Sequence, residues 1–270
     1  MPGMAAREID AEHDQSQGAP LEVRGLVPDP DARRGPLTEV SDGLYAHRFS
    51  AADQARREAV WPVLCTDFFQ RYVGAGATVI DVGAGDGLFL RNIRARRRIA
   101  VDTGERVRAL ADEGIEVRLR PADDFCEGLE GVADVVFLSN LLEHLPTKAA
   151  VVDVLRQCHQ ALRPNGRVIV LQPNVRYAGA AYWDYLDHQI ALTDRSVAEA
   201  LRVAGFELVE LRVRFLPYTT ASFRGLPAAW LAKLVRVYLR LPWLWRLFGA
   251  QSLLVGRPVH LEPEDAHGRP

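Results

Sequence analysis

A glycine-rich turn that directly follows an apolar stretch is the segment of this chain best suited to hold a nucleotide-like ligand. Residues 78–82 are mostly β-branched and apolar, which is typical of a buried parallel strand. Gly83, Gly85 and Gly87 follow, and glycine lets the backbone turn sharply and approach a ligand closely. A helix predicted from about residue 87 to 96 would point its first amide groups at that ligand. This unit predicts a binding site at the carboxyl edge of a parallel sheet.

The spacing within this turn argues against a dinucleotide as the ligand. A dinucleotide-binding turn has a third glycine or alanine where this chain has Leu88. Asp86 also lies inside the turn, where its charge would repel a pyrophosphate and attract a cation. Asp81, at the end of the strand, supplies a second carboxylate that we expect to face the same pocket. The turn therefore favours a cationic ligand without phosphate, although an ordinary strand-to-helix turn can look similar.

Further strands are predicted at regular intervals, and polar residues follow several of them. Residues 98–101 predict a second strand that ends in Asp102, where a doubly wound fold has the acid that binds ribose hydroxyls. Residues 116–120 predict a third strand, and residues 133–139 predict a fully apolar fourth strand that runs into Asn140. The stretch 162–166 then ends a helix and opens a fifth strand over residues 167–171.

The order and spacing of these segments resemble the class I methyltransferases, whose cofactor S-adenosylmethionine carries a sulfonium and an ammonium but no phosphate. The resemblance implies an α/β, doubly wound, Rossmann-like fold. Its seven-stranded sheet would be mostly parallel with an antiparallel last strand, and helices would cover both faces. In the family the acid after the third strand binds the adenine amino group, a role for Asp123 or Asp124, with Phe125 against the ring. The cofactor-binding residues implied are Asp81, Gly83, Gly85, Asp86, Gly87, Asp102, Asp123, Asp124, Phe125 and Asn140.

Four further segments resemble one bacterial branch of these enzymes, whose substrates are usually unassigned. They are residues 139–145, 172–177, 182–188 and 215–220. The resemblance spans roughly residues 45–258 and implies O-methylation of a small molecule or glycan precursor, in specialised-metabolite or surface-polysaccharide biosynthesis. Two other functions stay open: a nicotinamide-dependent oxidoreductase on the same sheet, disfavoured by Leu88 and Asp86, and a non-catalytic module that binds the cofactor.

Two histidines are the candidates for a general base, because imidazole accepts a proton near neutral pH. His144 follows the fourth strand, and His188 lies past the fifth strand on the other wall of the same crevice. We favour His188, since Asp187 and nearby aromatic residues offer a carboxylate and a stacking surface. The alternative for either histidine is a structural role, in which it only caps or packs a helix. The substrate-binding candidates are Glu143, Tyr182, Trp183, Asp184, Tyr185 and Asp187.

A divalent metal is the alternative at the same place. Some class I methyltransferases bind a cation through Glu-x-x-Glu-His after the fourth strand, and this chain has Asn140 in place of the first glutamate. Asn140, Glu143, His144 and His188 would form a mixed oxygen and nitrogen site. The missing carboxylate argues against it, and we predict no metal.

Composition bounds the class of protein. The 270 residues are 48% hydrophobic and 25% charged with a net charge of −2, so no nucleic-acid partner is expected. The three cysteines have neither zinc nor disulfide spacing. The N-terminus lacks the apolar stretch of a signal peptide, which favours a cytoplasmic location.

The chain divides into a domain with flanking tails. We expect a disordered tail over residues 1–40, a methyltransferase domain over 41–260 and a C-terminal tail over 261–270. Within the domain, residues 41–74 would form a helical cap and residues 217–249 a helical insertion between strands six and seven. Helices are predicted over 53–72 and 193–204, and the last two strands over 206–215 and 251–256.

The inserted segment, residues 226–248, is the other informative part of the sequence. Its first helix ends before Pro242 and has apolar residues on one face and basic residues on the other. This pattern is typical of a helix in a membrane interface, which would associate the protein with a membrane and suit a lipid-linked acceptor. A substrate lid or a dimer contact would use the same pattern. The acceptor is expected to be a small molecule, a sugar or a lipid-linked molecule, and the oligomeric state stays open.

Overall fold

The computed structural model describes residues 50–219 and 226–259. The predictions for the two tails, for residues 41–49 of the cap and for residues 220–225 of the insertion lie outside this part of the chain. No helix in the described part combines the length and apolar character required to cross a membrane.

A single seven-stranded sheet organises the described residues. Its strand order is β3-β2-β1-β4-β5-β7-β6, with β7 antiparallel to both of its neighbours and the remaining pairs parallel. This arrangement confirms the predicted doubly wound α/β fold with an antiparallel last strand. The strands are β1 (Thr78–Val82), β2 (Arg97–Asp102), β3 (Glu116–Leu119), β4 (Ala133–Ser139), β5 (Leu162–Pro173), β6 (Phe206–Leu216) and β7 (Gln251–Pro258).

Two apolar cores cover the two faces of the sheet, because side chains along each strand alternate between the faces. In β4, Val135 and Phe137 belong to one core and Val136 and Leu138 to the other. All four side chains are buried. The central strands therefore appear in the sequence as continuous apolar runs, which is why their positions could be predicted.

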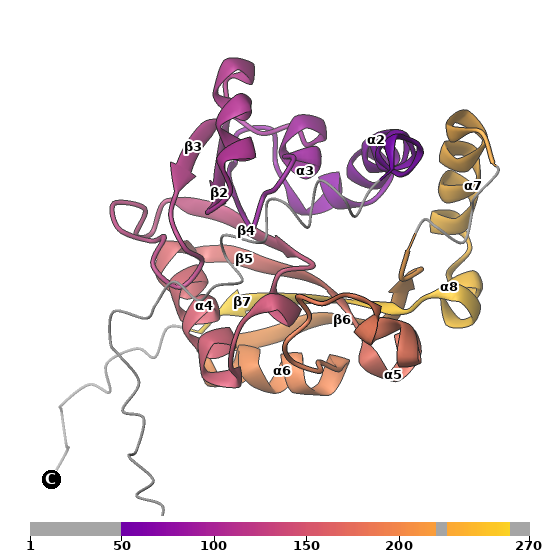
Figure 1. The fold of residues 1–270 in the computed structure, drawn as a ribbon. Coiled ribbons are helices and arrows are strands. Elements are labelled where there is room, and N and C mark those ends of the chain that lie inside the picture. The colour runs from indigo at the N-terminus through magenta and orange to yellow at the C-terminus, as the bar shows by residue number, and fades with distance from the viewer. Residues whose placement is uncertain (1–49, 220–225, 260–270) are drawn as a thin grey trace, which may run out of the picture. The chain divides into compact units, whose positions relative to one another are not determined.

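Helices pack on both faces (Figure 1). One core includes residues of α2 (Ala51–Asp67), α3 (Leu88–Asn92), α7 (Ala228–Arg240) and α8 (Pro242–Phe248). The other includes residues of α4 (Lys148–Ala161) and α6 (Asp194–Val203). The short helix α5 (Val175–Ala178) follows β5, and four 3₁₀ segments complete the described part: η1 (Phe69–Tyr72), η2 (Glu105–Glu113), η3 (Leu142–His144) and η4 (Gly179–Asp184).

The helix after the glycine turn is shorter than the predicted range of 87–96. It ends at Asn92, and Ile93 has an extended backbone with φ −88° and ψ 136°. The chain must change direction there because the backbone amides of Arg96 and Arg97 both donate to the carbonyl oxygen of Ala77, which begins the pairing of β2 with β1.

Helices α7 and α8 form the predicted insertion between β6 and β7. Leu231, Leu239 and Trp245 anchor the pair in the core. The Tyr238 hydroxyl donates to the carbonyl oxygen of Phe215 at 2.6 Å, and the Trp245 indole donates to that of Tyr238 at 2.8 Å. These contacts fix the inner face of the two helices to the sheet.

Phe69 lies at the centre of an aromatic cluster that joins η1 to the sheet. Its ring is fully buried, and its centroid is 5.2 Å from that of Phe137 and 6.0 Å from that of Phe89. We expect Phe69→Ala to lower the free energy of unfolding by about 3–5 kcal/mol, because it leaves a cavity among packed rings. Urea unfolding followed by circular dichroism measures the change. The exposed Val209→Ala is the control, and an equal loss in both variants would contradict this role for the cluster.

Candidate active site

The glycine turn adopts the backbone that only glycine adopts readily. Gly83, Gly85 and Gly87 have φ values of 75°, 51° and 67°. A Cβ added at Gly83 would collide with the side chain of Leu141, and one at Gly87 with that of Leu110. A Cβ at Gly85 would meet nothing within 4 Å. Gly83 and Gly87 are therefore required by packing, whereas the space beside Gly85 is open.

Asp102 ends β2 directly beside this open space. One carboxylate oxygen accepts a hydrogen bond from the Gly85 amide at 2.8 Å, and the other accepts from the Gly104 amide at 2.8 Å. These bonds fix the carboxylate against the glycine turn. Each oxygen keeps a second lone pair with which to accept a ligand hydroxyl.

Asp86 has protein partners that the sequence analysis did not predict. Its carboxylate lies 3.1 Å from Arg57 on α2 and 3.6 Å from Arg106 on η2. Two guanidinium groups thus compensate a charge that we expected to attract a cationic ligand. The negative charge available to such a ligand at this end of the turn is correspondingly smaller.

Asp81 lies beneath the turn rather than on its surface. The residue is 3% exposed, and burial, together with the charge of Asp102, raises the pKa of its carboxyl well above the ordinary value. It does not line the cavity described below. The expectation that Asp81 faces the pocket is thus not met, because all five residues of β1 are buried.

The residues after β3 divide between surface and core. Asp123 and Asp124 are exposed, and Asp124 pairs with Arg120 at 3.3 Å. Phe125 is fully buried in the core that covers one face of the sheet. It is therefore not on the surface where we expected it to meet an adenine ring.

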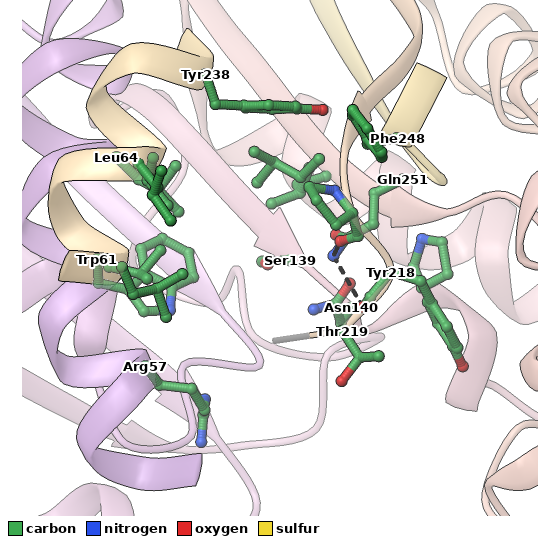
Figure 2. A pocket seen from close by; sticks show the side chains of 18 of the residues that line it. Arg57, Trp61, Leu64, Ser139, Asn140, Tyr218, Thr219, Tyr238, Phe248 and Gln251 are labelled. Atoms are coloured by element: carbon green, nitrogen blue, oxygen red, sulfur yellow. Dashed lines mark hydrogen bonds between the residues drawn. The ribbon is translucent and has the colours of Figure 1, made fainter. Parts of the chain in front are cut away.

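A cavity of about 400 Å³ opens beside the carboxyl ends of β4 and β5, within the usual range for small-molecule sites. Helix α2 supplies one wall, including Arg57 and Trp61, and helices α7 and α8 supply another, including Tyr238 and Phe248 (Figure 2). Most of the lining is apolar. Apart from Arg57 on α2 and Tyr238 on α7, the polar side chains gather at one end and are Ser139, Asn140, Glu143, His144, Tyr185, His188, Tyr218, Thr219 and Gln251.

Glu143 is a buried carboxylate in this polar end. Its residue is 1% exposed, and Oε2 accepts a hydrogen bond from the Gln172 amide at 2.9 Å. Burial raises the pKa of the Glu143 carboxyl above its ordinary value, and the neighbouring His144 ring opposes part of this rise. Oε1 has no hydrogen-bond partner among the described residues.

His144 is held in one orientation by Asp187. Its Nδ1 lies 3.0 Å from the carbonyl oxygen of Asp187 and 3.3 Å from that residue's Oδ2. A carbonyl oxygen only accepts, so Nδ1 carries the hydrogen, and Nε2 of the neutral ring keeps its lone pair. His144 lines the cavity, and its side chain is 25% exposed.

His188 is the more enclosed of the two histidines. Its side chain is 4% exposed, and its ring packs against those of Tyr182 at 4.8 Å, His144 at 4.9 Å and Tyr185 at 5.2 Å. Our preference for His188 as the base rested on Asp187 and on the neighbouring aromatic residues Trp183 and Tyr185. In the structure the Asp187 carboxylate lies against Nδ1 of His144, at 3.3 Å.

Only some of the predicted substrate-binding residues line the cavity. Glu143 and Tyr185 line the cavity. Tyr182 is fully buried, and its hydroxyl donates to the carbonyl oxygen of Ile190 at 2.7 Å, which makes it part of the support for His188. Trp183 and Asp184 are exposed and do not contribute to the lining.

Glu143, His144 and His188 are close enough together to share one cation. One ligand atom from each lies within 4.8 Å of the other two, with Nε2 of His144 at 3.8 Å and Nε2 of His188 at 4.0 Å from Glu143 Oε1. Two imidazoles and a carboxylate are a donor set that suits zinc or another transition metal. The sequence analysis considered this set with Asn140 as a fourth member.

Several residues of the cavity had no predicted role. Trp61 and Gln251 come from elements far apart in the sequence, and their meeting depends on the fold. Tyr218 belongs to the segment 215–220, which carried the branch resemblance but no chemical role. Asn140, which did have a predicted role in cofactor binding, also lines the cavity and has φ 51°, a left-handed backbone uncommon outside glycine and often found at functional sites.

Comparison with known proteins gives the class of this chain. A model of the family described as a methyltransferase domain matches residues 54–211. The chain therefore belongs to the methyltransferase-domain family, and S-adenosylmethionine is its cofactor. The site fits that cofactor, because the space beside Gly85 is open and the adjacent Asp102 carboxylate can accept from ribose hydroxyls.

Individual relatives are more distant. The chain is 37% identical over 106 residues to a ubiquinone biosynthesis O-methyltransferase from Pseudomonas paraeruginosa, covering 36% of this chain and 44% of that relative. It is 37% identical over 82 residues to a ribosomal protein L11 methyltransferase from Caldicellulosiruptor bescii, or 27% of each chain. The chain thus matches less than half the length of these curated relatives. A solved S-adenosylmethionine-dependent methyltransferase from Archaeoglobus fulgidus has the same fold, with TM-score 0.55 and 18% identity over 80% of this chain and 98% of that one.

Gly85→Val tests the cofactor site. The valine side chain would occupy the open space beside the turn, so we expect loss of S-adenosylhomocysteine binding in isothermal titration calorimetry. Gly114→Val is the matched control, because Gly114 also has a positive φ, of 71°, and open space around its Cβ position, but lies at the end of η2. Normal affinity in the Gly85 variant would show that the cofactor does not bind at this turn.

Glu143→Gln tests the buried carboxylate. Because the folded-state pKa of Glu143 is raised, its ionisation opposes folding once the pH exceeds the unfolded-state value of about 4.3. We therefore expect the glutamine variant to match the wild type near pH 4 and to be more stable by about 1–3 kcal/mol at pH 8. Urea unfolding at both pH values measures the difference. The exposed Glu207→Gln should show no such trend, and a glutamine variant destabilised more at pH 8 than at pH 4 would contradict the assignment.

Proposed function

We propose that this protein transfers a methyl group from S-adenosylmethionine to a hydroxyl oxygen of a small acceptor bound in the cavity. The observation that carries the proposal is the Nε2 lone pair of His144, fixed by Asp187 and located beside the buried Glu143. When bound, the cofactor supplies a methyl group that is already activated by the sulfonium. The chain must then position the acceptor, exclude water and take one proton.

His144 is the proposed base. The acceptor hydroxyl gives its proton to Nε2 as the oxygen forms its bond to the methyl carbon, while the bond between that carbon and the sulfonium sulfur breaks and S-adenosylhomocysteine leaves. The imidazolium that results is stabilised by Asp187 at Nδ1 and by the Glu143 carboxyl 3.8 Å from Nε2. His188 supports this arrangement from the buried side and lies 4.0 Å from the same carboxyl oxygen.

Polar atoms in the cavity wall support a hydroxylated acceptor. The Tyr218 hydroxyl, Gln251 Oε1 and Glu143 Oε1 are buried and lack a hydrogen-bond partner among the described residues. Buried polar atoms normally have hydrogen-bond partners. The amide oxygen of Gln251 can only accept a hydrogen bond, and so can Glu143 Oε1 when the carboxyl group is ionised. An acceptor with two or more hydroxyl groups would satisfy them, as a catechol or a sugar ring does.

The apolar remainder of the lining supports an acceptor that also carries a hydrocarbon part. A glycan precursor on a lipid carrier or a specialised metabolite with an alkyl chain meets both requirements, in agreement with the bacterial branch that residues 172–177 and 215–220 resemble. One relative is named ubiquinone biosynthesis O-methyltransferase, and this name supports oxygen as the methylated atom. The ribosomal protein L11 methyltransferase shares a similar identity over fewer residues, so the relatives alone do not fix the acceptor.

A metal-assisted version of the same reaction is the second candidate. It is favoured by the cluster of Glu143, His144 and His188, whose ligand atoms lie within 4.8 Å of one another. These three residues would then hold the cation, which would supply a lowered pKa for the acceptor hydroxyl, and the histidines would act as ligands instead of bases. Activity lost on treatment with EDTA and restored by one divalent cation would support this version.

His144→Ala tests the base on the best acceptor from a panel of catechols, alkyl alcohols and sugars, with radiolabelled S-adenosylmethionine. We expect kcat to fall by roughly 10²–10⁴-fold with cofactor affinity nearly unchanged, the usual range for loss of a general base.

His159→Ala is the matched control, because His159 lies on α4 outside the cavity lining. A loss below tenfold in His144→Ala would rule out the base. Transfer to amines but to no hydroxyl compound would rule out oxygen as the methylated atom.

A further inference from the structure

Helices α7 and α8 expose large apolar side chains on the side that faces away from the core. Trp230, Trp243, Leu247 and Phe248 are 58–60% exposed, and Leu234 and Val237 are 46% and 51% exposed. Trp230, Leu234 and Val237 follow one another at helical spacing on α7. Scattered exposed apolar residues are ordinary, but a group gathered on two consecutive helices indicates an interaction surface. We call these six residues the outer apolar face.

The same two helices also carry basic residues and no acidic ones. The segment from Leu226 to Phe248 contains Lys233, Arg236, Arg240 and Arg246 and no aspartate or glutamate, although the whole chain has a net charge of −2. Arg236 pairs with Asp67 of α2 at 2.9 Å. The Lys233 ammonium lies 5.0 Å from the centroid of the Trp230 ring, so cation and aromatic ring are neighbours on the surface.

The outer apolar face continues into the cavity. Leu234, Val237 and Phe248 are exposed and also line the cavity. Tyr238 lines the cavity from α7, and Phe248 from α8 (Figure 2). The rim of the site is therefore apolar on this side, and whatever covers the outer apolar face also covers part of the cavity entrance.

We propose that the outer apolar face docks on an anionic lipid bilayer. Exposed tryptophans beside lysine and arginine suit the interface between lipid headgroups and acyl chains. The absence of acidic residues from the segment gives charge complementarity with anionic headgroups. The inner faces of both helices are anchored through Leu231, Leu239 and Trp245, so the outer side chains are presented on a fixed support.

Docking of this kind gives the cavity direct access to the membrane. An acceptor with a hydrocarbon chain passes from the bilayer along the apolar rim to the polar end that contains His144, without its chain crossing water. This step rests on the proposed function. The docking itself does not, because it depends only on α7 and α8.

Vesicle flotation with the full chain tests the docking. The probes are phosphatidylcholine vesicles with and without phosphatidylserine, at low and high salt. We expect binding only with phosphatidylserine and a decrease at high salt, as screening requires. Trp230→Ser combined with Trp243→Ser should weaken binding by about tenfold or more. Lys233→Glu combined with Arg246→Glu should weaken it by at least about tenfold.

Matched controls come from exposed positions outside these helices. Val203→Ser with Val209→Ser replaces two exposed apolar residues, and Arg195→Glu with Arg202→Glu reverses two exposed charges on α6. Both should bind vesicles like the wild type. All variants should keep the wild-type melting temperature and affinity for S-adenosylhomocysteine, because neither tryptophan lines the cavity.

Two outcomes would overturn the proposal. The first is failure of the wild-type chain to float with either vesicle. The second is a wild-type dimer in light scattering that the tryptophan double variant converts to a monomer, which would assign the face to a second copy of the chain. Loss of methyl transfer in a variant that still floats would concern the proposed function and leave the docking intact.

Discussion

The site depends on one constraint, which is that parallel strands paired side by side end at the same edge of their sheet. Val82 pairs with both Val101 and Leu138, and Ser139 pairs with Leu171, so β2, β1, β4 and β5 end together. The residues that come next, or that end the strand, therefore meet although about 90 positions separate the first from the last. They are Gly83, Asp102, Asn140 and Pro173. In the proposed function, the cofactor binds at the ends of β1 and β2 and the acceptor at the ends of β4 and β5.

The same constraint explains which parts of the fold and of the site could be predicted from the sequence. Residues 78–82 and 133–139 were predicted with the bounds that the structure has, because strands buried on both faces are continuous apolar runs. The glycine turn and Asp102 followed from their position after such strands. Phe125 was placed incorrectly because it lies in an irregular segment, where no periodicity indicates which side of the chain is buried.

Contacts between distant elements could not be predicted. Arg57 and Asp86 are 29 residues apart, and His144 and Asp187 are 43 residues apart. Both pairs depend on how helices and turns pack, which composition and spacing do not determine. For α7 the amphipathic pattern predicted a helix and Pro242 predicted its end. The helix also has a second, exposed apolar face, formed by Trp230, Leu234 and Val237. This face could be recognised only once the packing of α7 on α2 was known.

Helix α2 touches both halves of the site. Near its start Arg57 pairs with Asp86 of the glycine turn, and at its last residue Asp67 pairs with Arg236 of α7. Trp61, between them, forms part of the cavity wall. One rigid body thus borders the cofactor turn, the acceptor cavity and the inserted helices. A movement of α2 would therefore couple the two binding sites. If cofactor binding at the turn shifts this helix and changes the affinity for the acceptor, thermodynamic linkage requires acceptor binding to change the affinity for the cofactor by the same factor.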